Sequence, residues 1–441
     1  MFHHIATACA LALFLLVIPA FGEDQPPNVI LIMVDDLGYH DLGCYGHPAI
    51  KTPVLDQLAK DGIRLTSFYS GATVCTPSRM ALLTGAYPTR LGWTKGVIGH
   101  KMGKDEGLSP KALTIAEILK NKGYETGLMG KWHLGDLPKY QPQQQGFDQS
   151  YYIKKSNNQT KKLWRGDELI EDPFENRLLT QKFTHEAIRF IKEKKEKPFF
   201  LYLPYTAPHF PVEAHPKWKG RSGFGAYGDV VEELDYRIGE ILTTLAMEKL
   251  DQKTIVIFLS DNGPQGGQKA QAKPFRGMKW DSLEGGTRVP CILRFPGVIP
   301  AGQEGEALIA AIDLLPSLIQ ACGLDLKTIA KGSPTRDGMN VWDTLIGKKD
   351  APHPRKDLLY WHGLKGFHAI RVGHWKLFLD GKDAQLPKEK GGPILFNLVD
   401  DPYEITDLSA HYPERVQEMQ ELAKKRLVDI NKSVIPLGKA E

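Results

Sequence analysis

The stretch NVILIMV at Asn28–Val34 is a continuous apolar run that ends in Asp35-Asp36. Such a run is typical of a strand buried on both faces, as in a parallel sheet covered by helices. Two further runs have the same form, at 198–203 and at 254–259. Helical patterns lie between the runs, at 53–61, 114–122, 178–194 and 230–250. This alternation predicts an α/β fold, with a large doubly wound sheet flanked by helices.

Polar side chains follow these runs at the point where each run ends. Asp35 and Asp36 follow the first run, His209 comes shortly after the second, and Asp261 and Asn262 follow the third. In doubly wound folds the functional groups gather beyond the carboxyl ends of the strands, so we expect these residues to share one crevice. The hard oxygen donors among them favour Ca²⁺ or Mg²⁺ over zinc, and they belong to Asp35, Asp36, Asp261 and Asn262. The alternative is that each acidic segment is an ordinary solvated turn.

The segment Cys75-Thr76-Pro77-Ser78-Arg79 predicts the start of a helix that ends near Gly85. Pro77 suits a first helical turn, because its missing N–H costs nothing there. The i, i+4 spacing places Arg79 on the same face as Cys75. Free N–H groups and the positive end of the helix dipole make this position a ready anion site. The alternative is a small buried cysteine beside an ordinary helix start.

The order C-x-P-S-R, followed by Leu83-Thr84-Gly85, resembles the signature of the type I sulfatases of the alkaline phosphatase superfamily. In that family a maturation enzyme oxidises the cysteine to formylglycine, and the hydrated aldehyde attacks sulfur. The resemblance implies that Cys75 is the precursor of the nucleophile and that Arg79 holds the resulting diol. It also implies an alkaline-phosphatase-like mixed sheet and hydrolysis of a sulfate ester. The motif spacing is similar to that of the arylsulfatase A and N-acetylgalactosamine-6-sulfatase branch.

Further segments match the same family in order. Lys131-Trp132-His133-Leu134-Gly135 resembles the segment whose lysine contacts sulfate and whose histidine is the base that expels it. His209 matches a histidine that binds sulfate and protonates the leaving oxygen, and Lys279 matches a lysine that pairs with sulfate and the leaving group. Ser156 lies in a divergent segment and matches a serine that assists His133. The resemblance assigns the family's divalent cation, usually calcium, to Asp35, Asp36, Cys75, Asp261 and Asn262.

The first residues, 1–22, are typical of a secretory signal peptide, because an apolar run ends in small residues before Glu23. The alternative is a membrane anchor, but the run is too short to span a bilayer comfortably. We therefore expect an exported protein, periplasmic or extracellular, with no stable membrane span.

The pattern changes near residue 338. Short strands are expected at 369–379 and 394–398, followed by a closing helix at 412–431. We therefore expect a catalytic domain at 23–337 and, at 338–441, a smaller α+β subdomain of antiparallel sheet plus helix, which the resemblance also implies.

Composition excludes several other classes of protein. The net charge is +4 with scattered lysines, and no basic helix or RNA-binding motif is present, so we expect no nucleic-acid partner. Dinucleotide and P-loop glycine signatures are absent. Beyond residue 22 the cysteines are Cys44, Cys75, Cys291 and Cys322. With Cys75 modified an odd number is left, so the chain is not a disulfide-built scaffold.

The sequence therefore predicts a sulfatase that acts on an aryl sulfate in assay and on a sulfated carbohydrate in nature. One alternative is a phosphonate monoester or phosphodiester hydrolase with the same nucleophile and metal ligands. The other is a non-catalytic protein that binds sulfated glycans and keeps Cys75 as a thiol. A secondary question is whether Tyr360-Trp361-His362 lines a sugar subsite or, as we prefer, packs inside the smaller domain.

Overall fold

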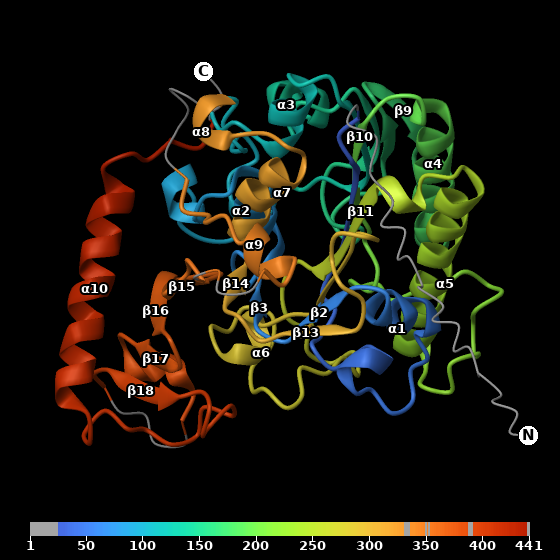
Figure 1. Cartoon of the computed structure of the whole chain (residues 1–441). Coiled ribbons are helices and arrows are strands. Elements are labelled where there is room, and N and C mark those ends of the chain that lie inside the picture. Colours follow the sequence, from blue (N-terminus) through green and yellow to red (C-terminus); the bar gives the residue numbers. More distant parts are fainter. Residues whose placement is uncertain (1–24, 330–335, 349–350, 352, 387–390, 439–441) are drawn as a thin grey trace, which may run out of the picture.

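The computed structural model describes residues 25–329, 336–348, 351, 353–386 and 391–438 (Figure 1). Its main feature is a ten-stranded sheet. The strands run in the spatial order β13 (Gln303–Gly305), β2 (Ile63–Leu65), β12 (Cys291–Arg294), β11 (Thr254–Ser260), β1 (Asn28–Val34), β10 (Phe199–Pro204), β6 (Glu125–Lys131), β7 (Gln149–Ile153), β8 (Leu163–Arg165) and β9 (Glu168–Glu171).

The apolar run at Asn28–Val34 forms β1 near the middle of this sheet. Every residue of β1 is buried, and the strand pairs in parallel with β10 on one side and β11 on the other. Strand β6 continues the parallel set beside β10. The pairs β11–β12, β12–β2, β7–β8 and β8–β9 are antiparallel, so the sheet is mixed, as expected. The parallel core brings the carboxyl ends of β1, β6, β10 and β11 to one edge.

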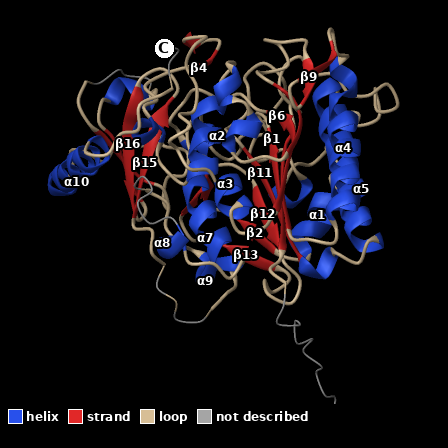
Figure 2. Ribbon diagram, turned by 90° about the horizontal axis from the view of Figure 1, so that it is seen from above, coloured by secondary structure: helices blue, strands red, loops and turns tan. Residues whose placement is uncertain are grey.

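Helices cover both faces of the sheet (Figure 2). One face packs against α1 (Pro53–Lys60), α4 (Leu179–Lys194) and α5 (Ala226–Met247). The other packs against α2 (Cys75–Thr84), α3 (Ile115–Lys120) and α7 (Leu314–Ala321). The short α-helices and strands of this part of the chain are α6 (Glu284–Thr287), α8 (Leu326–Ile329), α9 (Trp342–Leu345), β3 (Phe68–Tyr69), β14 (Ile309–Ala310), β4 (Val97–Ile98) and β5 (Lys101–Met102). This three-layer arrangement confirms the predicted fold class.

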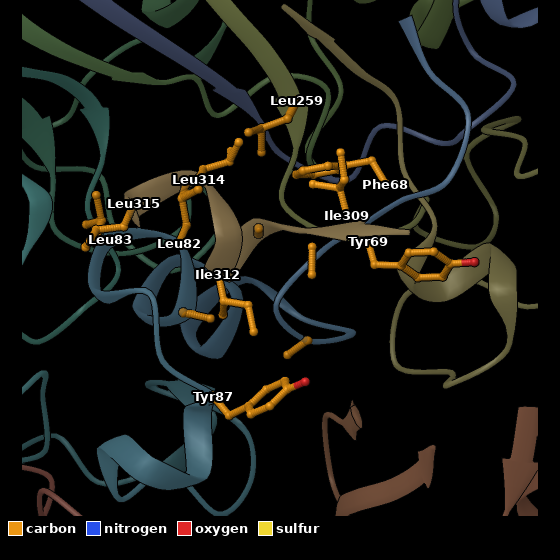
Figure 3. Close-up of a cluster of buried hydrophobic side chains, with 14 of the residues drawn as sticks. Phe68, Tyr69, Leu82, Leu83, Tyr87, Leu259, Ile309, Ile312, Leu314 and Leu315 are labelled. Carbon is orange, nitrogen blue, oxygen red and sulfur yellow. The ribbon is translucent and has the colours of Figure 1, made fainter. Parts of the chain in front are cut away.

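Helix α2 is buried along its whole length. It ends at Gly85, whose backbone is left-handed and whose N–H donates to the Ala81 carbonyl, which closes the last turn. Its apolar side chains Leu82 and Leu83 face Leu314 and Leu315 in the core (Figure 3). The helix is therefore a fixed internal element on which the first residues of the motif are held.

The smaller subdomain is a four-stranded antiparallel sheet beside a long helix. Its strands are β15 (Asp357–His362), β16 (Gly366–Val372), β17 (Trp375–Phe378) and β18 (Ile394–Asn397), and the helix is α10 (Pro413–Asn431). The expected single strand at 369–379 is wrong, because a turn at Gly373, with φ of 58°, divides it into a hairpin. The domain boundary near residue 338 stays a prediction.

The smaller subdomain makes hydrogen bonds and ion pairs to residues 276–284, which belong to the part of the chain that carries the ten-stranded sheet. Arg276 donates to the carbonyl oxygens of Glu404 at 2.6 Å and of Ala384 at 3.0 Å. Lys376 on β17 makes buried ion pairs with Glu284 at 3.0 Å and with Glu404 at 2.7 Å. The position of this segment therefore depends on both parts of the chain.

Two expectations concern the chain ends and the thiols. The signal peptide at 1–22 lies outside the described residues. Among the described residues, no helix is long and apolar enough to cross a membrane. Cys44, Cys75, Cys291 and Cys322 are all free thiols.

Candidate active site

A pocket of about 420 Å³ opens beyond the carboxyl ends of the central strands. Five of the residues expected at the site line it: Cys75, His133, Ser156, His209 and Lys279. The other expected residues are buried and pair with one another, and Asp36 also pairs with the lining residue Lys279; they are Asp35, Asp36, Arg79, Lys131, Asp261 and Asn262. The structure thus brings all the predicted residues into one region.

The start of α2 connects the strand ends that form the site. The Thr76 hydroxyl donates to the carbonyl of His133 at 3.0 Å. The Ser78 hydroxyl donates to the carbonyl of Asp261. The Arg79 guanidinium donates to the Asp261 carboxylate at 2.8 and 3.1 Å and to the carbonyl of Lys131 at 2.9 Å. The motif therefore holds Cys75 against the ends of β6 and β11.

Opposite charges alternate below the pocket. Lys131 Nζ donates to Asp35 at 2.6 Å, and Lys279 Nζ lies 2.8 Å from Asp36. Although burial opposes ionisation, Lys131 and the neighbouring cations hold the pKa of Asp35 well below its usual range. Burial and the charge of Asp35 raise the pKa of Asp261 to about 7. Three carboxylates this close repel one another, which favours a cation among them.

The donor set fits a hard divalent cation. Oxygen atoms of Asp35, Asp36 and Asp261 lie within 4.8 Å of one another. Asp35 Oδ1 and Asn262 Oδ1 are buried and have no hydrogen-bond partner among the described residues. The Asn262 amide nitrogen donates to Asp36 Oδ1 at 2.7 Å, so its oxygen is left free to act as a ligand. Buried oxygens without partners are rare, and an all-oxygen set is what Ca²⁺ and Mg²⁺ prefer.

Two of the histidines that line the pocket, His133 and His209, have different environments. His133 Nε2 lies 3.0 Å from the Ile98 carbonyl and must donate to it. Nδ1, which has no partner among the described residues, therefore carries the lone pair in the neutral ring. Burial and Lys131 lower the pKa of His133 well below its usual value. His209 is 8% exposed, and burial lowers its pKa to about 4. Its Nε2 lies 3.7 Å from Asp36 Oδ2.

Three residues of the site have a left-handed backbone without being glycine. The φ angles are 68° at Asp36, 61° at His133 and 81° at Trp280. This conformation is unfavourable for L-residues and is seen mainly where surrounding contacts enforce it. Hydrogen bonds enforce it here, because the N–H of Asp36 donates to Asp261 and that of Trp280 to the Thr73 carbonyl. Such strain is typical of functional sites.

The thiol of Cys75 is a weak nucleophile as it stands. Burial raises its pKa to about 11, against the opposing charges of Lys131 and Lys279. The reactive form of cysteine is the thiolate, so this residue would be protonated and inert near neutral pH.

Sequence reasoning missed several residues of the pocket. His100 and Trp280 line it, with ring centroids 5.9 Å apart, and Gln159 lines it from the loop after β7. Asn157, which is buried beside His209, was also missed. Trp280 and Asn157 each follow a predicted residue, Lys279 and Ser156, whereas His100 had no signal of this kind. Ser156 lines the pocket but provides no partner for His133 Nδ1.

The aromatic cluster of the smaller domain is packed in the core. Tyr360 is 2% exposed and Trp361 is 1% exposed. The Tyr360 hydroxyl donates to Glu284 at 3.0 Å. These two side chains therefore do not line the pocket, in agreement with the reading we preferred.

Comparisons with known proteins place the chain among the sulfatases. The family model "Sulfatase" matches residues 27–324. Arylsulfatase A from Homo sapiens is 33% identical over 90% of this chain and 87% of its own length. The N-acetylgalactosamine-6-O-sulfatase of Bacteroides thetaiotaomicron is 31% identical over 91% of this chain and 93% of its own. A solved sulfatase structure from Pseudoalteromonas sp. has a TM-score of 0.83 at 25% identity, covering 94% of this chain and 92% of that one. The chain therefore belongs to the sulfatase family and is a sulfate ester hydrolase.

Proposed function

We propose that this sulfatase hydrolyses the sulfate ester of a sulfated carbohydrate, with formylglycine formed from Cys75 and a divalent cation, Ca²⁺ or Mg²⁺, at the site. One observation carries the proposal: Cys75 lies on the pocket wall, and its sulfur is within 4.8 Å of a carboxylate oxygen of Asp35. Asp35 Oδ1 and Asn262 Oδ1 are buried without a hydrogen-bond partner among the described residues. Asp35, Asp36, Asp261 and Asn262, with the modified residue 75, would hold the cation. When bound, it would polarise a sulfate oxygen and help to activate the diol.

The chain's own residues supply the remaining chemistry. Lys131, Lys279 and Arg79 surround the sulfate with fixed positive charge, which stabilises the charge that builds up in the transition state. His209, at the pocket wall, acts as an imidazolium: it gives its Nε2 proton to the leaving oxygen as the sulfur–oxygen bond breaks, and the neutral ring remains. His133 then takes a proton from the second hydroxyl of residue 75 through its bare Nδ1, so that sulfate is expelled and the aldehyde is restored.

The rim of the pocket supports a carbohydrate as the leaving group. Four amide side chains line it, at Asn158, Gln159, Gln265 and Gln268. Amides both donate and accept hydrogen bonds, as sugar hydroxyls require. Trp280 adds a flat apolar wall against which the face of a sugar ring can pack. No acidic side chain of the described residues lines this pocket, which suits a negatively charged substrate.

The decisive experiment begins with protein produced alongside a formylglycine-generating enzyme. The mass of the tryptic peptide that carries residue 75 reports conversion of thiol to aldehyde. The converted protein is then assayed on 4-nitrophenyl sulfate, on sulfated mono- and disaccharides, and on a phosphodiester and a phosphonate monoester of the same phenol. Turnover confined to sulfate esters supports the proposal. Preference for the phosphorus esters, or saturable glycan binding without turnover by converted protein, would reject it.

We also infer that the protein is exported and meets its maturation enzyme on the way. The motif around Cys75 and the sequence of residues 1–22 support this inference. N-terminal sequencing of the mature protein from its native host tests it. A start near residue 23 agrees with export, whereas an intact Met1 contradicts it.

A further inference from the structure

We propose that Asn157 is a positioning residue that fixes the ring of His209, as part of a hydrogen-bond relay that begins at the carbonyl of Pro211. The proposal rests on the proposed function, in which His209 protonates the leaving oxygen. It assigns a role to two asparagines, Asn157 and Asn176, that lie outside every motif found in the sequence.

The relay consists of three contacts between four residues. Asn176 Nδ2 donates to the Pro211 carbonyl at 2.9 Å. Asn157 Nδ2 donates to Asn176 Oδ1 at 2.7 Å. His209 Nδ1 lies 3.0 Å from Asn157 Oδ1. Asn157 is 2% exposed and His209 is 8% exposed, so bulk water does not compete for these groups.

The donor and the acceptor of each hydrogen bond in the relay follow from the carbonyl of Pro211, at which the relay begins. A carbonyl oxygen can only accept, so the Asn176 amide must present its nitrogen to Pro211 and its oxygen to Asn157. Asn157 must then present its nitrogen to Asn176 and its oxygen to His209. The ring nitrogen Nδ1 therefore carries the proton and donates. The carbonyl oxygen of Phe210, 2.6 Å from the same nitrogen, can also only accept, so it too requires the proton on Nδ1.

This assignment leaves Nε2 directed to the reacting groups. His209 lines the pocket, and its Nε2 lies on the side of Asp36. A ring held at Nδ1 cannot flip without losing two acceptors, so Nε2 stays available for the leaving oxygen. Asn157 also donates weakly to the His209 carbonyl at 3.5 Å, which ties the backbone to the same side chain. For the transfer His209 must be an imidazolium: Nδ1–H stays bound to its two acceptors, and the second proton, on Nε2, is the one given to the leaving oxygen. The relay thus sets the direction in which His209 gives its proton.

Replacing Asn157 should therefore lower kcat by an amount that depends on the leaving group of the substrate. A poor leaving group needs the proton, whereas 4-nitrophenolate leaves readily without it. General acid catalysis contributes about 10²- to 10⁴-fold, and the Phe210 carbonyl still holds the ring when Asn157 is replaced. We therefore expect Asn157→Leu to lower kcat for phenyl sulfate about tenfold more than for 4-nitrophenyl sulfate. KM should change little, because the cations that hold sulfate remain.

The experiment measures kcat and KM of converted protein on these two sulfates. The ratio of kcat for 4-nitrophenyl sulfate to kcat for phenyl sulfate reports the loss of the proton. Asn176→Leu, one step further along the relay, should shift this ratio in the same direction by about threefold. Asn157→Asp keeps an oxygen facing Nδ1 and should bring the ratio back towards wild type. Asn28→Leu is the matched control. It also removes a buried asparagine, but at the opposite end of β1, where Asn28 bonds Thr254 and Phe199. Its ratio should equal that of the wild type.

The outcomes separate the two proposals. An equal loss on both sulfates in Asn157→Leu, or an unchanged ratio, overturns the relay while leaving the sulfatase chemistry intact. If converted wild-type protein hydrolyses neither sulfate, the proposed function fails and the relay fails with it. If Asn157→Leu does not fold by circular dichroism, Asn176→Leu decides, because that residue is only partly buried.

Discussion

Replacing Lys376 with methionine tests how strongly the smaller subdomain is bound to the catalytic layer. Lys376 Nζ lies 3.0 Å from Glu284 and 2.7 Å from Glu404, and all three side chains are fully buried. It also lies 4.1 Å from the centroid of the Tyr360 ring. Methionine has a similar volume, so the change removes the charge without opening a cavity.

The magnitude follows from the burial of the two carboxylates. At these distances the gross attraction is roughly 6 kcal/mol per contact at an effective dielectric constant of about 20, but removing the charges from water offsets most of it. What remains measurable is the penalty of leaving buried carboxylates unpaired, about 3 to 5 kcal/mol. We therefore expect Lys376→Met to lower the free energy of unfolding by about that amount.

Guanidinium unfolding followed by circular dichroism measures the change, with the slope checked against wild type. The double variant Lys376→Met/Glu404→Gln is the internal control. Neutralising Glu404 should cost at least about 1 kcal/mol less in the methionine background than in wild type, because the residues interact directly. A single-variant loss below about 1 kcal/mol, or strictly additive effects, would refute the idea that this ion cluster joins the two parts.

Four further predictions concern the site and the pH dependence of stability. Cys75→Ala should abolish turnover without changing the thermal midpoint, whereas the buried control Cys322→Ala should remain active; residual turnover above a few per cent in Cys75→Ala contradicts the assigned nucleophile. His133→Ala should accumulate sulfated residue 75, which mass spectrometry detects as an added sulfonate; finding unmodified peptide after substrate addition counts against His133 as the base. Removing divalent cations with a chelator should lower the melting temperature, and returning Ca²⁺ at about 100 times its dissociation constant should restore about 2.7 kcal/mol; an unchanged melting curve speaks against the acidic cation site. Burial raises the pKa of Glu404 to about 7, so the folded state still binds a proton that the unfolded chain releases above about pH 4.3. The stability that this group contributes therefore falls as the pH rises from about 4.3 to about 7, and Glu404→Gln should remove that part of the pH dependence. An identical pH profile for the variant would show that Glu404 does not titrate in this range.

The sequence predicted the fold well where burial is continuous. Residues 29–34 are all apolar because β1 is covered on both faces, and the strand Asn28–Val34 has the predicted limits in the structure. β6, at Glu125–Lys131, was not predicted as a strand, because it has two glycines and charged residues at its ends. Its place in the sheet is set by pairing with β10 and β7 rather than by its own pattern. The hairpin at 366–378 was missed because Gly373 was not recognised as a turn.

In the candidate site, too, the residues that stand in sequence motifs could be predicted, and those brought in by loops could not. Residues that chemistry fixes, such as Arg79 and Lys131, stand in recognisable motifs and could be named from the sequence. His100, Trp280 and Asn157 come from loops, and only tertiary contacts bring them to the pocket. No local pattern of a single sequence records such contacts. The branch expected from motif spacing agrees with the arylsulfatase A and N-acetylgalactosamine-6-O-sulfatase relatives.

The hold of the smaller subdomain on residues 276–284 has a consequence for the order of events during biosynthesis. A chain is made from its N-terminus, so Lys279 and Trp280 leave the ribosome well before Lys376, Ala384 and Glu404 exist to hold their segment. The wall of the pocket that they form can therefore close only after synthesis is nearly finished. During that interval the segment around Cys75 lacks its final covering. Under the proposed function, this is when a maturation enzyme would reach a side chain that the finished protein buries.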